Sequence, residues 1–534
     1  MTNIVSAGDA ERHQRLIRNL QRPDAFAHAV AGIACIETHI SSVVLAGDFA
    51  YKLKKPLDLG FLDFSSLEKR RAACEEEVRL NRRTAPELYL DVVPVTGSVD
   101  APRIGGDGEA IEYAVRMRRF AQSALLDDAL EKGALPPELI DRLARHVAGF
   151  HAAAAVAAPG EGFGDAQAVH FPVQQNFVQL RERVDDAELL AQADLAERWS
   201  EAQFARLQPV FERRLAEGRV RECHGDLHLG NLILLEGEPR LFDGIEFSAG
   251  LRWIDVAADV AFLVMDLQRR GRPDLAARFL DAWLERSGDY DSLQVMRYYI
   301  AYRAMVRAKV AAIRLGQLGG EARAACLAEC RAYVALAVAQ AVPSRLFLAI
   351  ASGVSGSGKT SQSQGLVEAR GVIRVRADVE RKRLFGLAPE DSSAAVPGGI
   401  YGAEAGRRTY ARLAELAAGV IGAGWPVLVD ATFLRRAQRA AFAELSRRLQ
   451  VPFAILAFDA PEAMLRARVA ARSAQGGDAS EADVAVLEAQ LAQREPLAGD
   501  EPGAALPVDS AGAVSWPSLL PAFDALLDRV APPP

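Results

Sequence analysis

The chain has 534 residues, half of them hydrophobic and a quarter charged, which is the balance of a soluble globular enzyme with two or three domains. Its net charge is -7 with both signs mixed along the chain, so it lacks the concentrated basic face with which proteins grip a nucleic-acid backbone. No run reaches the roughly 18 apolar residues that a membrane helix needs, and residues 1–18 carry no apolar signal segment, so we expect a cytoplasmic protein without a membrane partner.

The first 120 residues predict a small sheet with one long helix. A turn at Gly47-Asp48 separates two apolar runs, which is the pattern of strand, tight turn and strand. A charged helix is expected over residues 66–84. The expected strands cover residues 42–45, 49–53, 91–95 and 111–117.

Helical periodicity follows over residues 135–150 and again over residues 254–318. Between these segments lies a polar run, residues 222–247, that is rich in His, Asp, Asn and Gly. Pro343 ends an alanine-rich helix and a buried strand begins directly after it, so we place a domain boundary there. The predicted domains are residues 1–342 and residues 343–534.

Two features of the helical region are expected to be structural rather than functional. Cys326 and Cys330 lie one helical turn apart, but no further ligand is nearby, so we expect buried, reduced thiols rather than a metal pair. Arg303, Arg307 and Lys309 share one helical face, which we expect to be a solvated face rather than an anion-binding site.

In the second domain, apolar strands alternate with helices. This alternation predicts an α/β domain with a parallel sheet and helices on both faces. The strands are expected at residues 346–352, 371–375, 426–429 and 453–458.

The polar run contains a pattern that phosphoryl transfer requires. Asp226 and Asn231 are five residues apart, the spacing found in the H-R-D-x-x-x-x-N loop of protein kinases, and Asp243-Gly244 follows where a second metal-binding aspartate stands. In such a site one Asp accepts the proton of the attacking hydroxyl, while an Asn and a second Asp hold Mg²⁺ on the phosphates. The alternative is a chance loop of polar residues.

The same run reads His-Gly-Asp-x-His-x-x-Asn from His224 to Asn231, and here the chain resembles the aminoglycoside phosphotransferase family, which includes choline and homoserine kinases. The resemblance covers about residues 35–340 and implies a bilobal, α+β, protein kinase-like domain. It implies one role for each residue of the pattern: catalytic base for Asp226, metal ligand for Asn231 and Asp243, support of the loop for His224, and packing against the loop for His228.

A kinase of this type also needs a lysine on a small-lobe strand, paired with a glutamate on a helix. Lys52 is the expected lysine, although Lys54 lies on the same strand face and competes with it; the alternative for Lys52 is an exposed strand residue. Of three consecutive glutamates in the predicted helix, the last, Glu77, is the expected partner. In the family, aspartates after the metal site brace the catalytic loop, so Asp259 is expected to be structural.

A second nucleotide site is predicted by Gly-Val-Ser-Gly-Ser-Gly-Lys-Thr, residues 353–360, which match G-x-x-x-x-G-K-[ST] directly after a predicted strand. The glycines let the backbone curl so that amide N–H groups point at phosphate oxygens, and the following helix adds its positive end. Lys359 would reach the β- and γ-phosphates, and Thr360 would hold Mg²⁺. The expected nucleotide-binding residues are Gly353, Ser355, Gly356, Ser357, Gly358, Lys359 and Thr360.

Asp378 and Arg381 follow the second strand of this domain, and residues 346–534 resemble the small P-loop kinases, the group of adenylate kinase, polynucleotide kinase, gluconate kinase and the zeta toxins. The resemblance implies that Asp378 accepts the proton of the attacking hydroxyl and that Arg381 steadies phosphate. The alternative is a helix-capping aspartate beside a solvated arginine.

Other polar residues complete the resemblance to these kinases. Asp430 ends an apolar strand, as in a Walker B strand, and would orient Mg²⁺ or its water; the alternative is a capping role. Arg466, Arg468 and Arg472 precede a polar stretch, residues 473–482, that resembles a kinase lid. Arginine suits a lid because its planar fork meets phosphate oxygens bidentately, and we expect Arg468 and Arg472 to do so; helix-surface arginines are the alternative.

The order of the two domains resembles bacterial proteins that fuse an aminoglycoside phosphotransferase-like kinase to a P-loop kinase, as do residues 37–41 and 52–56. The resemblance implies a bifunctional phosphotransferase in which each domain transfers the γ-phosphoryl group of ATP, with Mg²⁺, to a hydroxyl of a small-molecule acceptor. One alternative is that one domain is a nucleotide-binding regulatory module. Another, a polynucleotide 5′-hydroxyl kinase, is disfavoured by the charge balance.

Overall fold

A computed structural model describes residues 7–30, 32–60, 62–316, 318–396, 399–475, 479–501 and 503–529. The chain forms two compact units, the first of Met1–Gln175 with Gln208–Asp266 and the second of Asn176–Leu207 with Leu267–Pro534. The predicted boundary at residue 343 lies inside the second unit, which therefore also holds helices that precede the P-loop in the chain. Within the described ranges, no helix combines the length and the apolar composition that crossing a membrane would require.

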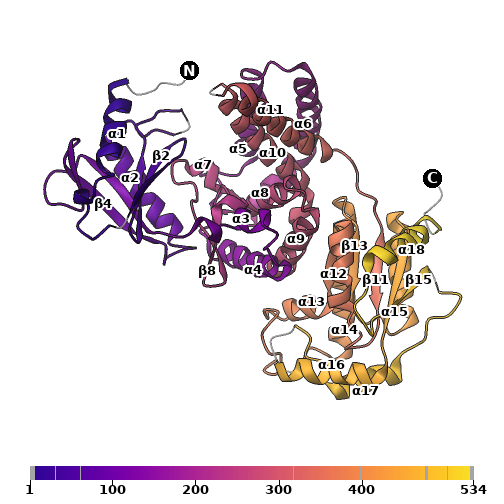
Figure 1. The fold of residues 1–534 in the computed structure, drawn as a ribbon. Helices are drawn as coiled ribbons and strands as arrows, with labels where there is room; N and C mark the ends of the chain where they lie inside the picture. Colours follow the sequence, from indigo (N-terminus) through magenta and orange to yellow (C-terminus); the bar gives the residue numbers. More distant parts are fainter. Residues whose placement is uncertain are drawn as a thin grey trace. The chain divides into compact units, whose positions relative to one another are not determined.

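The first unit begins with a six-stranded antiparallel sheet of order β1-β2-β3-β6-β4-β5 (Figure 1). Its strands are β1 (Ile33–Glu37), β2 (Ser41–Ala46), β3 (Phe49–Lys54), β4 (Tyr89–Ser98), β5 (Ala101–Ile104) and β6 (Glu112–Arg118). Because side chains alternate between the faces of a strand, one face packs on α1 (Ala7–Asn19) and the other on α2 (Leu67–Asn81). The predicted sheet and long helix are present, and the structure adds β1, β5 and α1.

Two short pairs of strands frame the polar run. Strand β7 (Val220–Glu222) pairs with β10 (Trp253–Asp255), and β8 (Leu232–Leu235) pairs with β9 (Glu238–Leu241). Residues 223–231, the Asp226 loop, therefore begin where β7 ends and finish where β8 begins. The nearby helices of this part of the chain are α3 (Leu126–Glu131), α4 (Pro137–Ala153) and α8 (Val256–Arg269).

Helices form the first part of the second unit's longer segment. They are α9 (Pro273–Ser287), α10 (Leu293–Leu315) and α11 (Gly320–Ala339), while α5 (Ala166–Arg181) and α6 (Ala187–Ala216) carry the chain between the two units. Helix α11 packs along α10, and the thiols of Cys326 and Cys330 donate to carbonyl oxygens of Ala311 and Ala308 on α10. Both cysteines are buried free thiols, as predicted from the sequence.

The predicted solvated face on α10 is wrong. The Arg303 residue is 3% exposed. Burial, together with the charge of Arg183, lowers the pKa of Lys309 to about 8. The guanidinium of Arg307 lies 5.9 Å from the ring of Tyr333 on α11. Periodicity shows which residues share a face of a helix but not which later helix covers that face.

The second unit contains a five-stranded parallel sheet of order β12-β13-β11-β14-β15, as predicted for this part of the chain. Its strands are β11 (Leu348–Ser352), β12 (Ile373–Arg376), β13 (Val427–Asp430), β14 (Phe453–Asp459) and β15 (Ala504–Asp509). The sequence analysis did not predict β15, an edge strand that contains Pro507. All five strands end at one edge of the sheet, because parallel strands point the same way.

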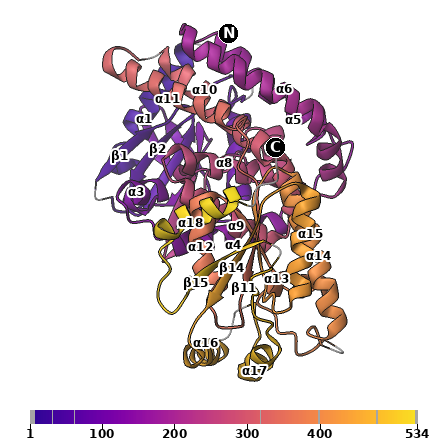
Figure 2. The same cartoon turned by 90° about the vertical axis from the view of Figure 1, so that its right-hand side faces the viewer.

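Helices lie on both faces of this sheet (Figures 1 and 2). One face, with a core of buried aliphatic and aromatic side chains, packs on α12 (Lys359–Arg370) and α18 (Trp516–Arg529). Helices α14 (Ala403–Gly422) and α15 (Arg436–Leu449) contact the strands from the other side. The remaining helices are α13 (Ala377–Leu384), α16 (Glu462–Gln475) and α17 (Val484–Gln493).

Candidate active sites

The P-loop lies between the end of β11 and the start of α12. Gly356 has a φ of +80°, and a Cβ atom there would lie 2.7 Å from the carbonyl oxygen of Leu465, so this position requires glycine. Lys359 Nζ donates to the carbonyl oxygens of Gly353 and Val354 at 2.8 and 3.0 Å. Together with Asp378, Arg381 and Asp430, the loop lines a cavity of about 600 Å³. The lysine therefore lies at the edge of the space that phosphates would occupy.

Adjacent parallel strands bring polar residues to the loop. Asp430 pairs in register with Ala351 of β11 and Arg376 of β12. Thr360 Oγ1 donates to Asp430 Oδ2 at 2.5 Å. A threonine hydroxyl beside a carboxylate is the oxygen set with which P-loop proteins hold Mg²⁺, directly or through water, so these residues fit the ion. The structure brings Thr360 and Asp430 together, as the sequence predicts.

Asp378 and Arg381 lie one turn apart on α13 and line the same cavity. Arg381 Nη1 donates to Asp378 Oδ1 at 3.0 Å. Burial alone would raise the pKa of Asp378, but Arg381 and Arg376 hold it below its ordinary value, so the carboxylate is ionised and can accept a proton. Arg376, not Asp378, caps α13, and the Arg381 side chain is 14% exposed, so the alternative of a capping aspartate beside a solvated arginine does not hold.

Two of the three arginines on α16 line the cavity. Arg468 donates to a P-loop carbonyl at 3.4 Å, and Arg472 donates to a carbonyl of the following segment at 3.0 Å. Arg466 instead forms exposed ion pairs with two glutamates. Residues 476–478 of the predicted lid stretch, residues 473–482, lie outside the described residues. Arg468 and Arg472 are therefore placed where a lid arginine would act, and Arg466 is not.

Gln490 is a site residue that the sequence analysis missed. The amide N–H of Ser355 in the P-loop donates to Gln490 Oε1 at 2.7 Å. Leu487, one turn earlier on α17, packs with Val354 of the P-loop in a buried cluster and so anchors the helix there. The glutamine oxygen thus takes a backbone donor that would otherwise face a phosphate oxygen.

Gln490→Ala is expected to tighten nucleotide binding at the P-loop by roughly two- to tenfold, because one competing hydrogen bond is removed. Titration calorimetry with Mg-ADP would measure it on a protein that also carries Asp243→Ala, which removes a proposed metal ligand and so weakens Mg-ADP binding at the other site. Gln493→Ala, an exposed glutamine of the same helix, serves as the matched control. Weaker binding by Gln490→Ala would show that the side chain holds phosphate rather than competes with it.

The Asp226 loop forms the centre of the other candidate site. Asn231 Nδ2 donates to the carbonyl oxygen of Asp226 at 2.9 Å and to Asp226 Oδ2 at 3.0 Å. Since the amide nitrogen is used there, the amide oxygen is the atom that a metal would take, and oxygen ligands are what Mg²⁺ prefers. His224 Nε2 lies 2.9 Å from the carbonyl oxygen of Phe242, the residue before Asp243. This contact links the Asp226 loop to the segment that carries Asp243.

His228 does more than the predicted packing against the loop. Its ring packs on Phe262 with the ring centroids 5.6 Å apart. The N–H of Gly230 donates to His228 Nδ1 at 3.1 Å, so Nε2 carries the ring's proton. This atom lies 3.3 Å from Asp226 Oδ2. His228 therefore helps to orient the carboxylate of the predicted catalytic base.

Asp259 on α8 braces the same loop, as expected. The backbone N–H groups of His224 and Gly225 donate to its two carboxylate oxygens at 3.1 and 2.9 Å. His151 Nε2 lies 3.1 Å from the same carboxylate, which is fully buried. Gly225 has a φ of +86°, and a Cβ atom there would lie 2.8 Å from the carbonyl oxygen of Leu251. The loop is therefore held by its backbone, and only glycine fits at its tightest point.

The lysine of the small lobe meets its predicted partner. Lys52 Nζ donates to Glu77 Oε1 at 2.7 Å and also to the carboxylate of Asp243. Lys54 points to the same side of β3 and pairs with the other oxygen of Glu77 and with Glu246. Two lysines and three carboxylates thus form one network. Both lysines pair with Glu77, but among the described residues only Lys52 of the two pairs with Asp243 as well.

Glu246 is the member of this network that the sequence analysis missed. The other two of the three consecutive glutamates pair elsewhere: Glu75 pairs with Arg71, and Glu76 pairs with Arg79 and Arg252. Burial would raise the pKa of Glu77, but the two lysines hold it below its ordinary value. The choice of Glu77 thus agrees with the observed geometry.

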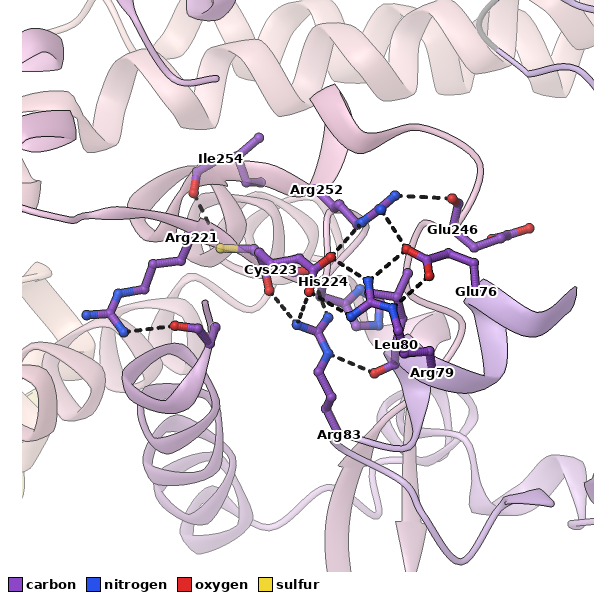
Figure 3. A network of polar contacts seen from close by, with 12 residues as sticks. Glu76, Arg79, Leu80, Arg83, Arg221, Cys223, His224, Glu246, Arg252 and Ile254 are labelled. Carbon is purple, nitrogen blue, oxygen red and sulfur yellow. Dashed lines mark hydrogen bonds and ion pairs between the residues drawn. The ribbon is translucent and has the colours of Figure 1, made fainter. Parts of the chain in front are cut away.

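Figure 3 shows a further polar network that ties α2 to the Asp226 loop. Arg79 of α2 donates to the carboxylate of Glu222, the residue before the loop, at 2.6 Å, and Arg83, two residues beyond the end of α2, donates to the backbone carbonyl of Glu222 at 2.7 Å. Arg252 donates to Glu222 at 3.2 Å and to Glu76 at 2.7 Å. These ion pairs connect the helix that carries Glu77 to the strand that leads into the catalytic loop.

Comparison with known proteins agrees with the two kinase-like domains. The phosphotransferase enzyme family matches residues 61–296, and the AAA domain family matches residues 348–497. Uncharacterized proteins of Mycobacterium tuberculosis and Mycobacterium bovis are each 31% identical to this chain over 458 residues, which cover 85% of this chain and 89% of the relative.

Solved kinase structures are similar to parts of the chain. A sugar kinase from Janibacter sp. is 22% identical, covers 35% of this chain and 96% of its own, and has a TM-score of 0.26. A choline kinase from Cryptosporidium parvum is 9% identical, covers 58% of this chain and 88% of its own, and has a TM-score of 0.38.

Proposed function

This chain belongs to the family of bacterial proteins that join an aminoglycoside phosphotransferase-like kinase domain to a P-loop kinase domain, and from that premise we propose that it is a bifunctional ATP-dependent phosphotransferase. Each domain would transfer the γ-phosphoryl group of ATP, with Mg²⁺, to a hydroxyl of a small-molecule acceptor. The observation that carries the proposal is the network in which Lys52 meets both Glu77 and Asp243, because kinases need this lysine–glutamate pair beside the metal-binding aspartate.

At the Asp226 site, the proposed roles follow from the contacts. Asp226 accepts the proton of the attacking hydroxyl, while Asn231 and His228 hold its carboxylate in place. Lys52 is positioned by Glu77 to neutralise phosphate oxygens, and Asp243 and Asn231 would hold Mg²⁺. Mg²⁺ would offset the charge that develops on the phosphates.

At the P-loop site, Asp378 accepts the proton of the acceptor hydroxyl, and Arg381 neutralises charge beside it. Lys359 and the backbone N–H groups of the loop bind the phosphates, and Arg468 and Arg472 close the cavity from α16. Thr360 and Asp430 would hold Mg²⁺. Because phosphoryl transfer needs mainly positioning and charge, no histidine is required here.

Two single variants test the proposal. ATP turnover is measured against a library of hydroxyl-bearing metabolites for the wild type, Asp226→Ala and Lys359→Ala. We expect each variant to lose turnover with a different set of acceptors, because the sites use separate residues. Lys132→Ala, which alters only an ion pair whose lysine is 61% exposed, is the control and should match the wild type.

The outcomes separate the alternatives. If Asp226→Ala leaves every turnover unchanged, the assignment of the first site fails. If Lys359→Ala removes nucleotide binding but no turnover, the P-loop domain is a nucleotide-binding regulatory module and not a second enzyme. Phosphorylation of a DNA 5′-hydroxyl by the wild type would replace the small-molecule acceptor at the P-loop site.

A further inference from the structure

The P-loop site of the second unit does not end at the boundary of the P-loop domain. Helix α9, which lies within the segment matched by the phosphotransferase enzyme family, packs beside α12 and against β12 in the same compact unit (Figure 1). Its Ala277 packs on the buried core beneath α12 and α18. Arg278 of α9 pairs with Glu368 of α12 at 2.9 Å. Helix α9 thus extends the helical layer that covers this face of the sheet.

A chain of contacts runs from α9 to the metal-binding threonine of the P-loop. Asp281 Oδ1 accepts the backbone N–H of Arg374 at 2.7 Å, and Asp281 Oδ2 lies 3.3 Å from Arg374 Nη2. The same guanidinium donates to the carbonyl oxygen of Thr360 at 2.6 Å and to Gln364 at 2.9 Å. Arg374 is therefore fixed at both ends, by α9 on one side and by the P-loop on the other.

A parallel chain runs from α9 to the acceptor side of the cavity. Glu285 Oε1 lies 2.8 Å from Arg376 Nη1, and Arg376 lines the cavity beside Asp378. Arg383 Nη2 donates to the backbone carbonyl of Glu285 at 2.5 Å. The positive charge of Arg376 in turn helps to keep the pKa of Asp378 low. Glu285 thus sets the position of an arginine that a phosphate or an acceptor would meet.

We propose that Asp281 and Glu285 of α9 are positioning residues for the P-loop site, Asp281 acting through Arg374 on Thr360 and Glu285 acting through Arg376 on the acceptor end of the cavity. The inference rests on the proposed function of that site. It means that the P-loop kinase of this chain is completed by a helix from the preceding phosphotransferase segment.

The charge of Asp281 is the part of this arrangement that matters most. Asp281 is 2% exposed, and a buried carboxylate is costly unless a cation pairs with it. Burial raises the pKa of Asp281 to about 7, although Arg374 lowers it in part, so the carboxylate carries most of its charge above pH 7, where the variants are compared. Without that charge, Arg374 keeps its hydrogen bonds to Thr360 and Gln364 but loses the ion pair with Asp281 that orients its guanidinium. The Thr360 carbonyl, and with it the hydroxyl on the same residue, is then less firmly placed.

Asp281→Asn in the full chain tests the inference, because asparagine retains an acceptor for the Arg374 N–H but removes the charge and the second acceptor oxygen that faces the Arg374 guanidinium. We expect the Mg²⁺ concentration for half-maximal turnover at the Lys359-dependent site to rise roughly three- to tenfold, as for the loss of one charged contact. Turnover that depends on Asp226 should keep its Mg²⁺ dependence. Asp274→Asn, on the same helix, alters a carboxylate that is 39% exposed and pairs with Arg272; it is the matched control and should show no change.

Glu285→Gln independently tests the contact of Glu285 with Arg376. We expect it to raise KM for the acceptor at the P-loop site several-fold while the Mg²⁺ dependence stays as in the wild type. A lower thermal midpoint for Asp281→Asn with an unchanged Mg²⁺ dependence would assign α9 a purely structural role and overturn the inference. If the wild type shows no Lys359-dependent turnover, the proposed function fails instead, and Mg-ADP affinity measured by calorimetry then tests Asp281 alone: an unchanged Mg²⁺ requirement for binding would overturn it.

Discussion

Asp226→Asn is expected to lower kcat at the first site by about 10²–10⁴-fold, the range that a positioned general base contributes. The substitution removes the carboxylate that accepts a proton but keeps the side-chain size, and Asn231 retains its bond to the backbone carbonyl of residue 226. KM for the nucleotide should change less than about threefold, because Lys52 and Asp243, not Asp226, meet the phosphates. Steady-state kinetics with an acceptor found in the metabolite screen would measure both constants.

The matched control is Asp128→Asn, in the same unit. Its carboxylate pairs with Lys132, whose side chain is 61% exposed, and such surface pairs contribute about 0–1 kcal/mol, so kcat should be close to that of the wild type. A loss in kcat of less than about tenfold for Asp226→Asn would contradict its role as the base. An equal rise in the nucleotide KM would instead indicate that the loop had moved.

Residue spacing alone specified only those parts of both sites that lie within one short segment, whereas Asp378, Asp430 and Arg468 were reached through the resemblance to P-loop kinases. In the P-loop and in the Asp226 loop, the residues that act together are at most eight positions apart, so spacing alone specifies their geometry. The fold class of the second domain was also accessible, because alternating strand and helix patterns predict a parallel sheet, whereas that of the first domain was implied by the family resemblance. The pairing of Lys52 with Glu77 was accessible only through resemblance, since it joins a strand to a helix.

Contacts between distant segments could not be predicted in this way. Gln490 meets Ser355 across 135 positions, and Arg374 meets Asp281 across 93, and neither residue carries a local pattern that marks it. Strand β15 was missed because Pro507 interrupts it, which is tolerated only on an edge strand. The face of α10 that carries Arg307 was misjudged because α11, whose Tyr333 lies against Arg307, comes later in the chain.

Lys54→Met is expected to destabilise the first unit by about 3–5 kcal/mol, the cost of breaking a buried ion pair by removing one partner. The Lys54 and Glu77 side chains are both 0% exposed, and that of Glu246 is 3% exposed. Glu246 therefore cannot reach water when Lys54 is lost. Burial already raises the pKa of Glu246, and Lys54 is the first of the cations that lower it. Urea unfolding of the full chain, followed at the transition of this unit, would measure the loss.

Two further variants distinguish the ion pair from simple loss of a lysine. Lys55→Met alters the neighbouring residue, whose partner Glu37 has a side chain that is 54% exposed, and should cost less than about 1 kcal/mol. Lys54→Met combined with Glu246→Leu removes both charges, and replacing a buried pair by apolar residues should restore most of the lost stability. If the double variant is as unstable as Lys54→Met alone, the cost lies in the packing of the lysine stem and not in an unpaired carboxylate. If Lys54→Met and Lys55→Met are equally mild, the network around Glu77 depends on Lys52 only, and Lys54 is not needed to hold the kinase lysine's partner.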